Sequence, residues 1–226
     1  MNTDALITQL AAAAGPVRRL APPWRRAALW LAIAMPFVAV VVVLASPRAD
    51  LAARISDARF LVEEIAAFAT AVAAAIAGFA LLVPGGDRRL ALVPIAPLAI
   101  WLASLGQGCV ATLLHPGQGA RLTSDWMCLP AIVMVGAVPA LAMVLMLRRG
   151  APLAPRLSAT LGALASAALA NVGLRLFHTE DASLTVLVWQ FGSVALLSTI
   201  AACFGDRLLD WPHTSAVTSP PRRTKY

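Results

Sequence analysis

The stretch Ala27–Ala45, AALWLAIAMPFVAVVVVLA, holds 19 consecutive residues without a charge. An α-helix rises about 1.5 Å per residue, so a segment of this length crosses the roughly 30 Å hydrocarbon core of a bilayer. Five more apolar segments of similar length follow along the chain: Leu61–Val83, Leu90–Leu114, Leu129–Leu147, Leu157–Phe177 and Leu184–Phe204. The sequence therefore predicts an all-α integral membrane bundle of six transmembrane helices.

The composition also favours a membrane protein and argues against a soluble globule. Of the 226 residues, 60% are hydrophobic and 13% are charged, and the mean hydropathy is +0.79. A soluble domain of this size would need a larger polar surface to cover its core. We therefore expect the lipid bilayer to be the main surrounding of the chain.

Basic residues fall mainly in alternate loops. Thirteen of the 18 Lys and Arg residues lie on one side of the predicted membrane, and the other five are Arg48, Arg54, Arg59, Arg121 and Arg175. Because cytoplasmic loops carry the excess of basic residues in multi-pass proteins, we expect both termini in the cytoplasm. This asymmetry accounts for the pI of about 10.9, so we expect no direct nucleic-acid partner.

The predicted spans divide the chain into three parts. Residues 1–26 form a cytoplasmic N-terminal segment, 27–204 form the transmembrane domain, and 205–226 form a cytoplasmic tail. The end of the tail is rich in Pro, Ser and Thr, so we expect it to be largely disordered. We find no paired acids, no Ser-His-Asp order and no Gly-rich phosphate loop in the sequence, so we expect neither an enzyme nor a bound cofactor.

The N-terminal segment contains a candidate binding helix over residues 3–14. Thr3 is a suitable N-cap residue, and Leu6, Ile7 and Leu10 share one face of the helix. A helix of about 11 residues is marginal alone in water and needs an apolar surface to lie against. That surface is either the bilayer or a groove on a soluble partner protein.

The charged residues of the predicted spans lie near the outer ends of those spans. Glu63 and Glu64 open the second span, and Arg175 closes the fifth. We expect Arg175 to be a solvated side chain at the interface, with Glu180 or Asp181 as an alternative partner. Ion-coupled carriers usually keep charges near the middle of the membrane, so a pump or proton-coupled carrier is disfavoured.

Small residues and prolines indicate how the helices pack. Ser158, Gly162, Ser166 and Ala170 recur every four residues, which allows another helix to approach the fifth span closely. The prolines of the third and fourth spans remove backbone donors and favour bends in those helices; they are Pro94, Pro97, Pro130 and Pro139.

The three cysteines differ in their predicted depth. Cys109 and Cys128 lie near the outer ends of the third and fourth spans, whereas Cys203 lies at the cytoplasmic end of the sixth. Consecutive helices are usually neighbours, so the two outer thiols are within possible disulfide range. Two interpretations stay open: the thiols fill the bundle as small core residues, or they carry redox or soft-metal chemistry beside His115.

Several short motifs together resemble one known family. In chain order they are Thr3-Asp4-Ala5-Leu6-Ile7, Arg18-Arg19-Leu20-Ala21-Pro22-Pro23, Asp50-Leu51 with Asp57-Ala58-Arg59-Phe60, Gly106-Gln107-Gly108-Cys109, Asp125-Trp126-Met127-Cys128-Leu129, and Asp181-Ala182-Ser183 with Leu187-Val188-Trp189. The chain resembles the NrsF family, negative regulators of sigma factor F, from about residue 1 to Trp211. Members of that family are six-span anti-sigma factors of the bacterial inner membrane.

The resemblance implies that this protein holds an extracytoplasmic-function sigma factor inactive at the membrane. Redox-active compounds or heavy metals are the signals associated with the family, and its sensing cysteines map onto Cys109 and Cys128. Relatives often carry another cysteine where this chain has His178.

The sequence therefore leaves two classes of function open. The leading one is a regulatory protein that binds the sigma factor through Leu6, Ile7 and Leu10 and senses stress through Cys109 and Cys128. The alternative is a small-molecule carrier or permease, which usually shows a polar path at mid-membrane and two related halves. The sequence shows neither of these features.

Overall fold

The computed structural model describes residues 2–13, 20–83, 85, 87–114, 128–150, 154–178 and 192–209. These residues form helices and connecting turns, without a β-strand. The elements are α1 (Thr3–Ala13), α2 (Pro23–Leu44), α3 (Leu51–Ile55), α4 (Ala58–Ala80), the 3₁₀ helix η1 (Arg88–Leu92), α5 (Ile95–Leu114), α6 (Cys128–Arg148), α7 (Pro155–Phe177) and α9 (Gly192–Leu208).

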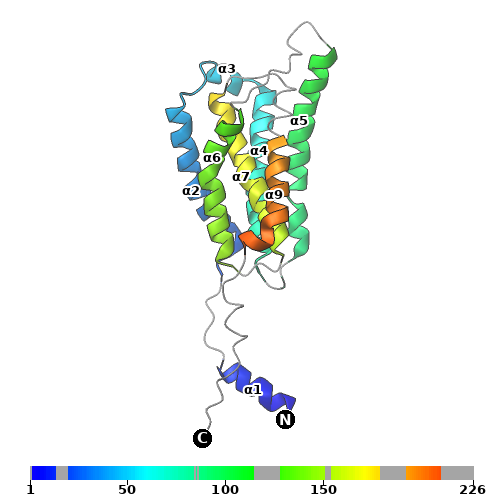
Figure 1. Cartoon of the computed structure of the whole chain (residues 1–226). Coiled ribbons are helices and arrows are strands. Elements are labelled where there is room, and N and C mark those ends of the chain that lie inside the picture. The colour runs from blue at the N-terminus through cyan, green and yellow to red at the C-terminus, as the bar shows by residue number, and fades with distance from the viewer. Residues whose placement is uncertain are drawn as a thin grey trace.

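Helix α7 lies at the centre of the bundle. It packs most extensively against α4, α6 and α9, while α5 packs against α4, and α2 packs against α6 and α4 (Figure 1). Ser158, Ser166 and Ala170 on α7 are all buried. The central position of α7 therefore follows from its small side chains, which let three neighbouring helices approach it.

Glycines mark the closest approaches to α7. A Cβ atom at Gly162 would lie 2.8 Å from Met143 Cγ of α6. A Cβ atom at Gly205 of α9 would lie 2.7 Å from the Cα of Arg156, a contact with backbone. Gly78 of α4 also faces α7, where its Cβ would lie 3.6 Å from Leu161 Cβ. The small residues predicted on α7 are thus complemented by glycines on two of its partner helices.

Five helices of the described chain are long and apolar enough to cross a membrane. They correspond to the first five predicted spans and lie within Pro23–Leu44, Ala58–Ala80, Arg88–Gln107, Pro130–Arg148 and Pro155–Phe177. The sixth predicted span, Leu184–Phe204, is described only from Gly192, where α9 begins, and its first part lies outside the described residues. Helix α9 also runs four residues beyond the predicted end, to Leu208. The number of six spans stays a prediction.

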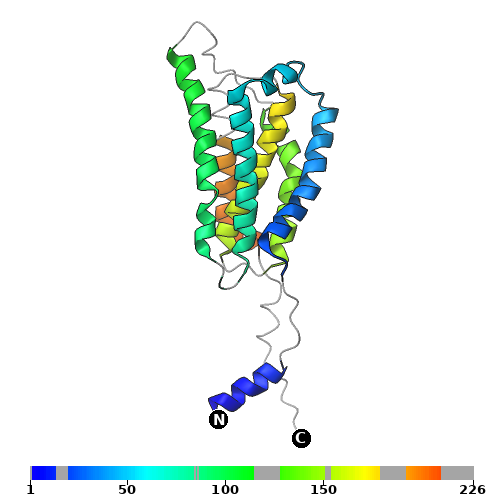
Figure 2. The ribbon, with the colours of Figure 1, turned by 180° about the vertical axis from the view of Figure 1, so that it is seen from behind.

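The two ends of the bundle differ. We call the end at which α2 begins and α9 ends the basal end, and the end at which α2 ends and α4 begins the distal end. Helix α1 lies beyond the basal end, apart from the bundle, in both views (Figures 1 and 2).

The short helix α3 at the distal end lies between the first two predicted spans, where the sequence predicts only a loop. Asp50 is its N-cap residue, and the helix exposes all of its side chains in part or in full.

Most of the conspicuous prolines start helices instead of interrupting them. Pro94 lies between η1 and α5, and Pro97 and Pro130 lie in the first turns of α5 and α6. A proline is tolerated there because the first backbone N–H groups of a helix have no partner within the helix. Pro139 lies inside α6, and Pro36 lies inside α2.

Two polar side chains fix α2 to the basal half of α6. Trp30 Nε1 donates a hydrogen bond to the Pro139 carbonyl oxygen at 2.9 Å, and the Trp30 side chain is fully buried. Arg26 donates to the Met146 carbonyl oxygen, and its guanidinium lies 4.6 Å from the centre of the Phe79 ring. These contacts bind the helix that follows α1 to the helix that begins at Cys128.

We predict that Gly173→Ala destabilises the bundle. Its new methyl group would lie 2.6 Å from Val38 Cγ1 and 2.8 Å from Val135 Cγ1, so these side chains or the helices that carry them must shift. Overpacking of this kind typically costs about 1–3 kcal/mol. The free energy of unfolding of the purified protein in micelles measures the effect.

Gly106→Ala in α5 is the matched control, because its Cβ would meet nothing within 4 Å. There we expect no loss, and a gain of up to about 1 kcal/mol from helix propensity. Equal stability changes for the two variants would contradict the close packing at Gly173.

Candidate functional site

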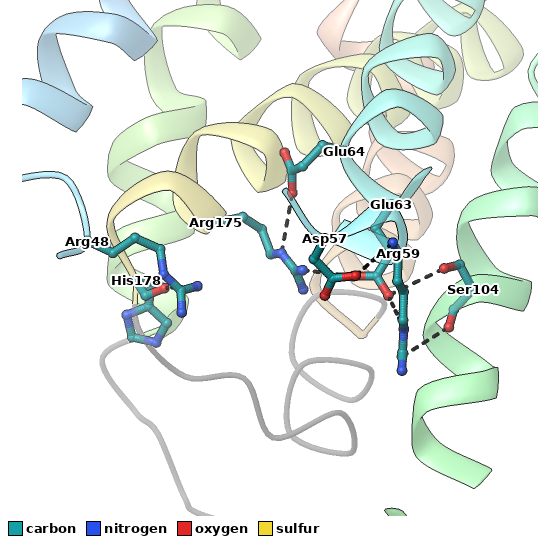
Figure 3. A network of polar contacts seen from close by, with 8 residues as sticks. All are labelled: Arg48, Asp57, Arg59, Glu63, Glu64, Ser104, Arg175 and His178. Atoms are coloured by element: carbon teal, nitrogen blue, oxygen red, sulfur yellow. Dashed lines mark hydrogen bonds and ion pairs between the residues drawn. The ribbon is translucent and has the colours of Figure 1, made fainter. Parts of the chain in front are cut away.

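A cluster of polar side chains joins three helices near the distal end. It consists of Arg59, Glu63 and Glu64 from α4, Ser104 from α5 and Arg175 from α7, and we call it the distal network (Figure 3). Hydrogen bonds and ion pairs between these side chains connect α4 with α5 and with α7.

Glu63 is the centre of this network. Arg175 Nη2 donates to Glu63 Oε2 at 2.7 Å, and Arg59 Nε donates to Glu63 Oε1 at 3.1 Å. The Ser104 hydroxyl donates to the same Oε1 at 3.4 Å, and Arg59 Nη2 donates to the Ser104 carbonyl oxygen at 3.2 Å. One carboxylate therefore connects α4 with both α5 and α7.

The ion pairs of the network are largely withdrawn from solvent. The side chains of Glu63, Arg175 and Glu64 expose only 5%, 13% and 14% of their surface. Arg175 Nε also lies 3.3 Å from Glu64 Oε1, and the guanidinium lies 5.1 Å from the centre of the Phe60 ring. Two guanidinium groups thus balance two carboxylates, and removal of one partner would leave a buried charge without its counter-ion.

Local sequence places the α4 members of the network. The Asp57 carboxylate accepts a hydrogen bond from the Arg59 backbone N–H at 3.0 Å and caps the start of α4. Arg59 and Glu63 are four residues apart, so both lie on one face of the helix. The cap fixes where the helix begins, and the spacing then brings the two side chains together.

The structure corrects the expected state of Arg175. The sequence predicts a solvated side chain, but Arg175 is largely buried and pairs with Glu63 and Glu64. Glu180 and Asp181, the alternative partners, lie outside the described residues. The sequence gives no local signal for this pair, because its members are 112 residues apart.

A second cation holds the end of α7 at the distal surface. Arg48, in the turn after α2, donates from its backbone N–H to the Leu176 carbonyl oxygen at 3.1 Å and from Nη1 to the His178 carbonyl oxygen at 3.3 Å. A cation at this position is favourable because the carbonyl end of a helix carries a partial negative charge. Arg48 therefore attaches the α2–α3 turn to α7.

Asp50 orients Arg48. Arg48 Nε donates to Asp50 Oδ1 at 2.6 Å, and Arg54 Nε donates to Oδ2 at 3.1 Å. The hydrogen bonds from Arg48 and then from Arg54 hold the pKa of the Asp50 carboxyl well below its usual value. The carboxylate therefore remains charged through the acidic range in which an ordinary Asp takes up a proton. The sequence analysis does not include this pair, although the short spacing Arg48-x-Asp50 could have indicated it.

The predicted sensing cysteines lie on two helices that do not pack along their lengths. Cys109 belongs to the distal part of α5, and Cys128 is the first residue of α6, but both side chains lie outside the described residues. Helix α5 packs against α4, whereas α6 packs against α7 and α2, and the two occupy opposite sides of the bundle (Figures 1 and 2). The assumption that these consecutive helices are packed neighbours is therefore wrong.

The remaining predicted residues are placed by their helices. Cys203 is an exposed free thiol in the basal part of α9. Leu6, Ile7 and Leu10 of α1 expose 38%, 58% and 63% of their surface, so the apolar face of α1 is largely uncovered. His115 lies outside the described residues, and the described part of the chain contains no cluster of three His, Cys, Asp or Glu side chains suited to a metal ion.

Comparison with known proteins gives one match. The family model described as negative regulator of sigma F (NrsF) matches residues 10–211. No curated protein and no solved structure matches the chain significantly. The matched region includes Cys109, Cys128 and the whole distal network, whereas Leu6 and Ile7 of α1 precede it.

We predict that Arg175→Met destabilises the protein by about 3–5 kcal/mol, because Glu63 and Glu64 then stay buried without their main counter-ion. The unfolding free energy in micelles is the measurement. Arg156→Met is the matched control on the same helix, since its pair with Asp206 leaves 70% and 50% of the two side chains exposed. We expect about 1 kcal/mol or less there. Equal losses would show that the distal network contributes no more than a surface pair.

Proposed function

The chain belongs to the NrsF family of negative regulators of sigma F, and we propose that it is a membrane-bound anti-sigma factor for an extracytoplasmic-function sigma factor. In this proposal it crosses a bacterial inner membrane six times and releases its partner under redox or heavy-metal stress. The observation that carries the proposal is the family match, which extends over most of the chain, from residue 10 to 211. Five helices of membrane-spanning length support the location.

We place the basal end of the bundle in the cytoplasm. Exposed basic residues collect there, including Arg25, Arg88, Arg149 and Arg207, and cytoplasmic ends of spans carry such an excess. The distal network then lies towards the periplasm. With this orientation α1 is on the side on which a sigma factor is found.

Helix α1 is the proposed binding element for the sigma factor. Its apolar residues Leu6, Ile7 and Leu10 are exposed, and the helix lies apart from the bundle (Figure 1). A short amphipathic helix gains stability when its apolar face enters a groove on a partner, and a few apolar anchors then dominate the affinity. The bilayer surface is the competing place for the same face.

Cys109 and Cys128 are the proposed sensing residues. A thiolate is oxidised reversibly and binds soft metal ions, and both residues belong to the distal parts of their helices. Because α5 and α6 lie on opposite sides of the bundle, a disulfide or a shared metal ion would require their distal ends to move towards each other. Such a movement changes the contacts that hold those ends in place.

Two sets of contacts support a route from the distal end to α1. Five residues before Cys109, Ser104 contacts Glu63, which pairs with Arg175 of α7, so a shift of α5 strains the distal network. Helix α6, which begins at Cys128, contacts Trp30 and Arg26 of α2 in its basal half. Since α2 follows α1 in the chain, we propose that a shift of α6 alters the position of α1.

The alternative function, a small-molecule carrier, gains no specific support. The charged side chains in the described spans lie near helix ends, and the acids of the distal network pair with arginines of the same network. A carrier usually needs polar groups at mid-membrane that face its substrate.

Replacement of Leu6, Ile7 and Leu10 together by Ser is predicted to release the sigma factor. Truncation of one buried apolar anchor typically costs at least about 1 kcal/mol, so three should weaken binding by about a hundredfold or more. Co-purification of the sigma factor with the full-length protein from membranes, and transcription from a sigma-dependent promoter, report the loss.

The control changes the other side of the same helix: Ala5→Ser, Gln9→Ser and Ala12→Ser. This variant should still retain the sigma factor, and both variants should insert into the membrane. If repression survives the change of Leu6, Ile7 and Leu10, the sigma factor binds elsewhere on the basal surface.

Cys109→Ser and Cys128→Ser should each abolish induction by oxidant or heavy metal while repression without stress persists, because serine neither oxidises in this way nor binds soft metals well. Cys203→Ser is the matched control and should leave induction normal. Sigma-dependent transcription with and without the inducer is the measurement. If induction is normal in Cys109→Ser and Cys128→Ser, the two thiols only fill space in the bundle, and the proposed sensing role is wrong.

A further inference from the structure

An apolar groove runs along one side of the bundle between α6 and α9, with α7 as its floor. Its volume is about 260 Å³, and Ile132, Ala140 and Leu147 of α6, Ala163 of α7, and Ile200 and Leu208 of α9 are among its lining residues. The floor is buried, since Ala167 and Ala170 expose 2% or less. The rims are open, because Val133 and Ile200 expose 54% and 44% of their surface.

Small residues create the groove. Gly136, Ala137 and Ala140 of α6 and Gly162 and Ala163 of α7 all line it. Helices α6 and α9 both pack closely on α7, so their larger side chains form two walls above a floor of small ones. The space follows from the same residues that let the helices approach α7.

The groove suits a hydrocarbon chain better than a protein segment. Its walls are almost entirely apolar, and most of its lining belongs to α6 and α7, two of the helices of membrane-spanning length. A helix with side chains is about 10 Å across, too wide for a space of this volume. An unfilled groove would also forfeit the dispersion contacts that its walls make with a well-packed neighbour. A single acyl chain meets these demands.

A basic side chain lies at the basal mouth of the groove. Arg148 donates to the carbonyl oxygen of Leu208, a lining residue, so its guanidinium lies at this mouth. Two further arginines are exposed close by in the chain: Arg149 follows Arg148, and Arg207 precedes Leu208. Among the described residues of α9 the acid is Asp206, and it pairs with Arg156 at 2.7 Å. Basic pockets at the cytoplasmic end of a bundle suit anionic lipid headgroups.

We propose that this groove is a binding site for one anionic phospholipid, with an acyl chain between α6 and α9 and its phosphate at Arg148 and its neighbours. The apolar walls select the hydrocarbon chain, and the basic mouth selects the charge of the headgroup. A bound chain would fill the space between two helices that both rest on α7.

The first experiment uses the unaltered full-length protein. It is reconstituted with phosphatidylglycerol that carries a photoreactive group in one acyl chain, and cross-linked peptides are identified by mass spectrometry. We expect labels to concentrate on the lining residues of α6, α7 and α9. Labelling of equal strength on the exposed side chains of α2 and α5, such as Val40 and Ile100, would overturn the site.

The second experiment counts lipids that remain bound after extraction into mild detergent, by native mass spectrometry. Phosphatidylglycerol should be retained at one per chain and at least tenfold more than phosphatidylcholine with the same acyl chains. Ala140→Phe fills the groove and should reduce retention at least tenfold, whereas Ala103→Phe, on an exposed face of α5, should not. Equal retention of both lipids, or unchanged retention in Ala140→Phe, would contradict the proposal.

The headgroup part has its own pair of variants. Arg148→Gln should remove most of the preference for phosphatidylglycerol, and Arg88→Gln, at an exposed basic residue of η1 that does not line the groove, should keep it. A change of oligomeric state in Ala140→Phe, without loss of lipid, would assign the groove to a second copy of the chain instead.

Discussion

The close approach of α4, α6 and α9 to α7 is the constraint on which the rest of the structure depends. Helices in hydrocarbon gain little from burying apolar surface against each other, since lipid tails are as apolar as their side chains. Packing contacts must supply the association instead, and these need small residues at the crossing points. Gly162 and Gly173 of α7 and Gly205 of α9 provide them, because a methyl group at any of these positions would collide with the neighbouring helix.

The distal network restricts how the packed helices are rotated against each other. Small side chains allow several rotations of one helix against another, whereas an ion pair between Glu63 and Arg175 is satisfied in one arrangement only. In a low-dielectric setting the cost of separating such a pair is large, so the network favours a single register of α4 against α7. Ser104 of α5 contacts Glu63 and so connects α5 to the same network. The extensive packing contacts of α5 are with α4.

The sequence predicts the helices better than it predicts their neighbours. Spans follow from length and hydropathy, because a backbone in hydrocarbon must satisfy its own hydrogen bonds and a helix does so locally. The central role of α7 is also visible in the four-residue repeat of small side chains. The pairing of Arg175 with Glu63 is not visible in the sequence, because it depends on the depth and rotation of two helices that are far apart in the chain. The placement of α5 and α6 on opposite sides of the bundle shows the limit of the rule that consecutive helices are neighbours. Arg48 was missed for a similar reason, because its partners at Leu176 and His178 belong to the end of a distant helix.

The two helices that carry the outer cysteines differ in what they can transmit. Helix α5 reaches the rest of the bundle through α4 and the distal network, so a change at Cys109 acts first on contacts near its own end. Helix α6 contacts α2 through Pro139 and Met146, which lie 11 and 18 residues beyond Cys128 towards the basal end. A signal can shift a conformational equilibrium only as far as it favours one arrangement over the other. Because the tie from α6 to α2 is made of directional hydrogen bonds to buried groups, a displacement of α6 must either carry α2 with it or break them. Helix α6 is therefore the more direct mechanical link between the distal end and α2, while the distal network restrains the distal ends of α4, α5 and α7.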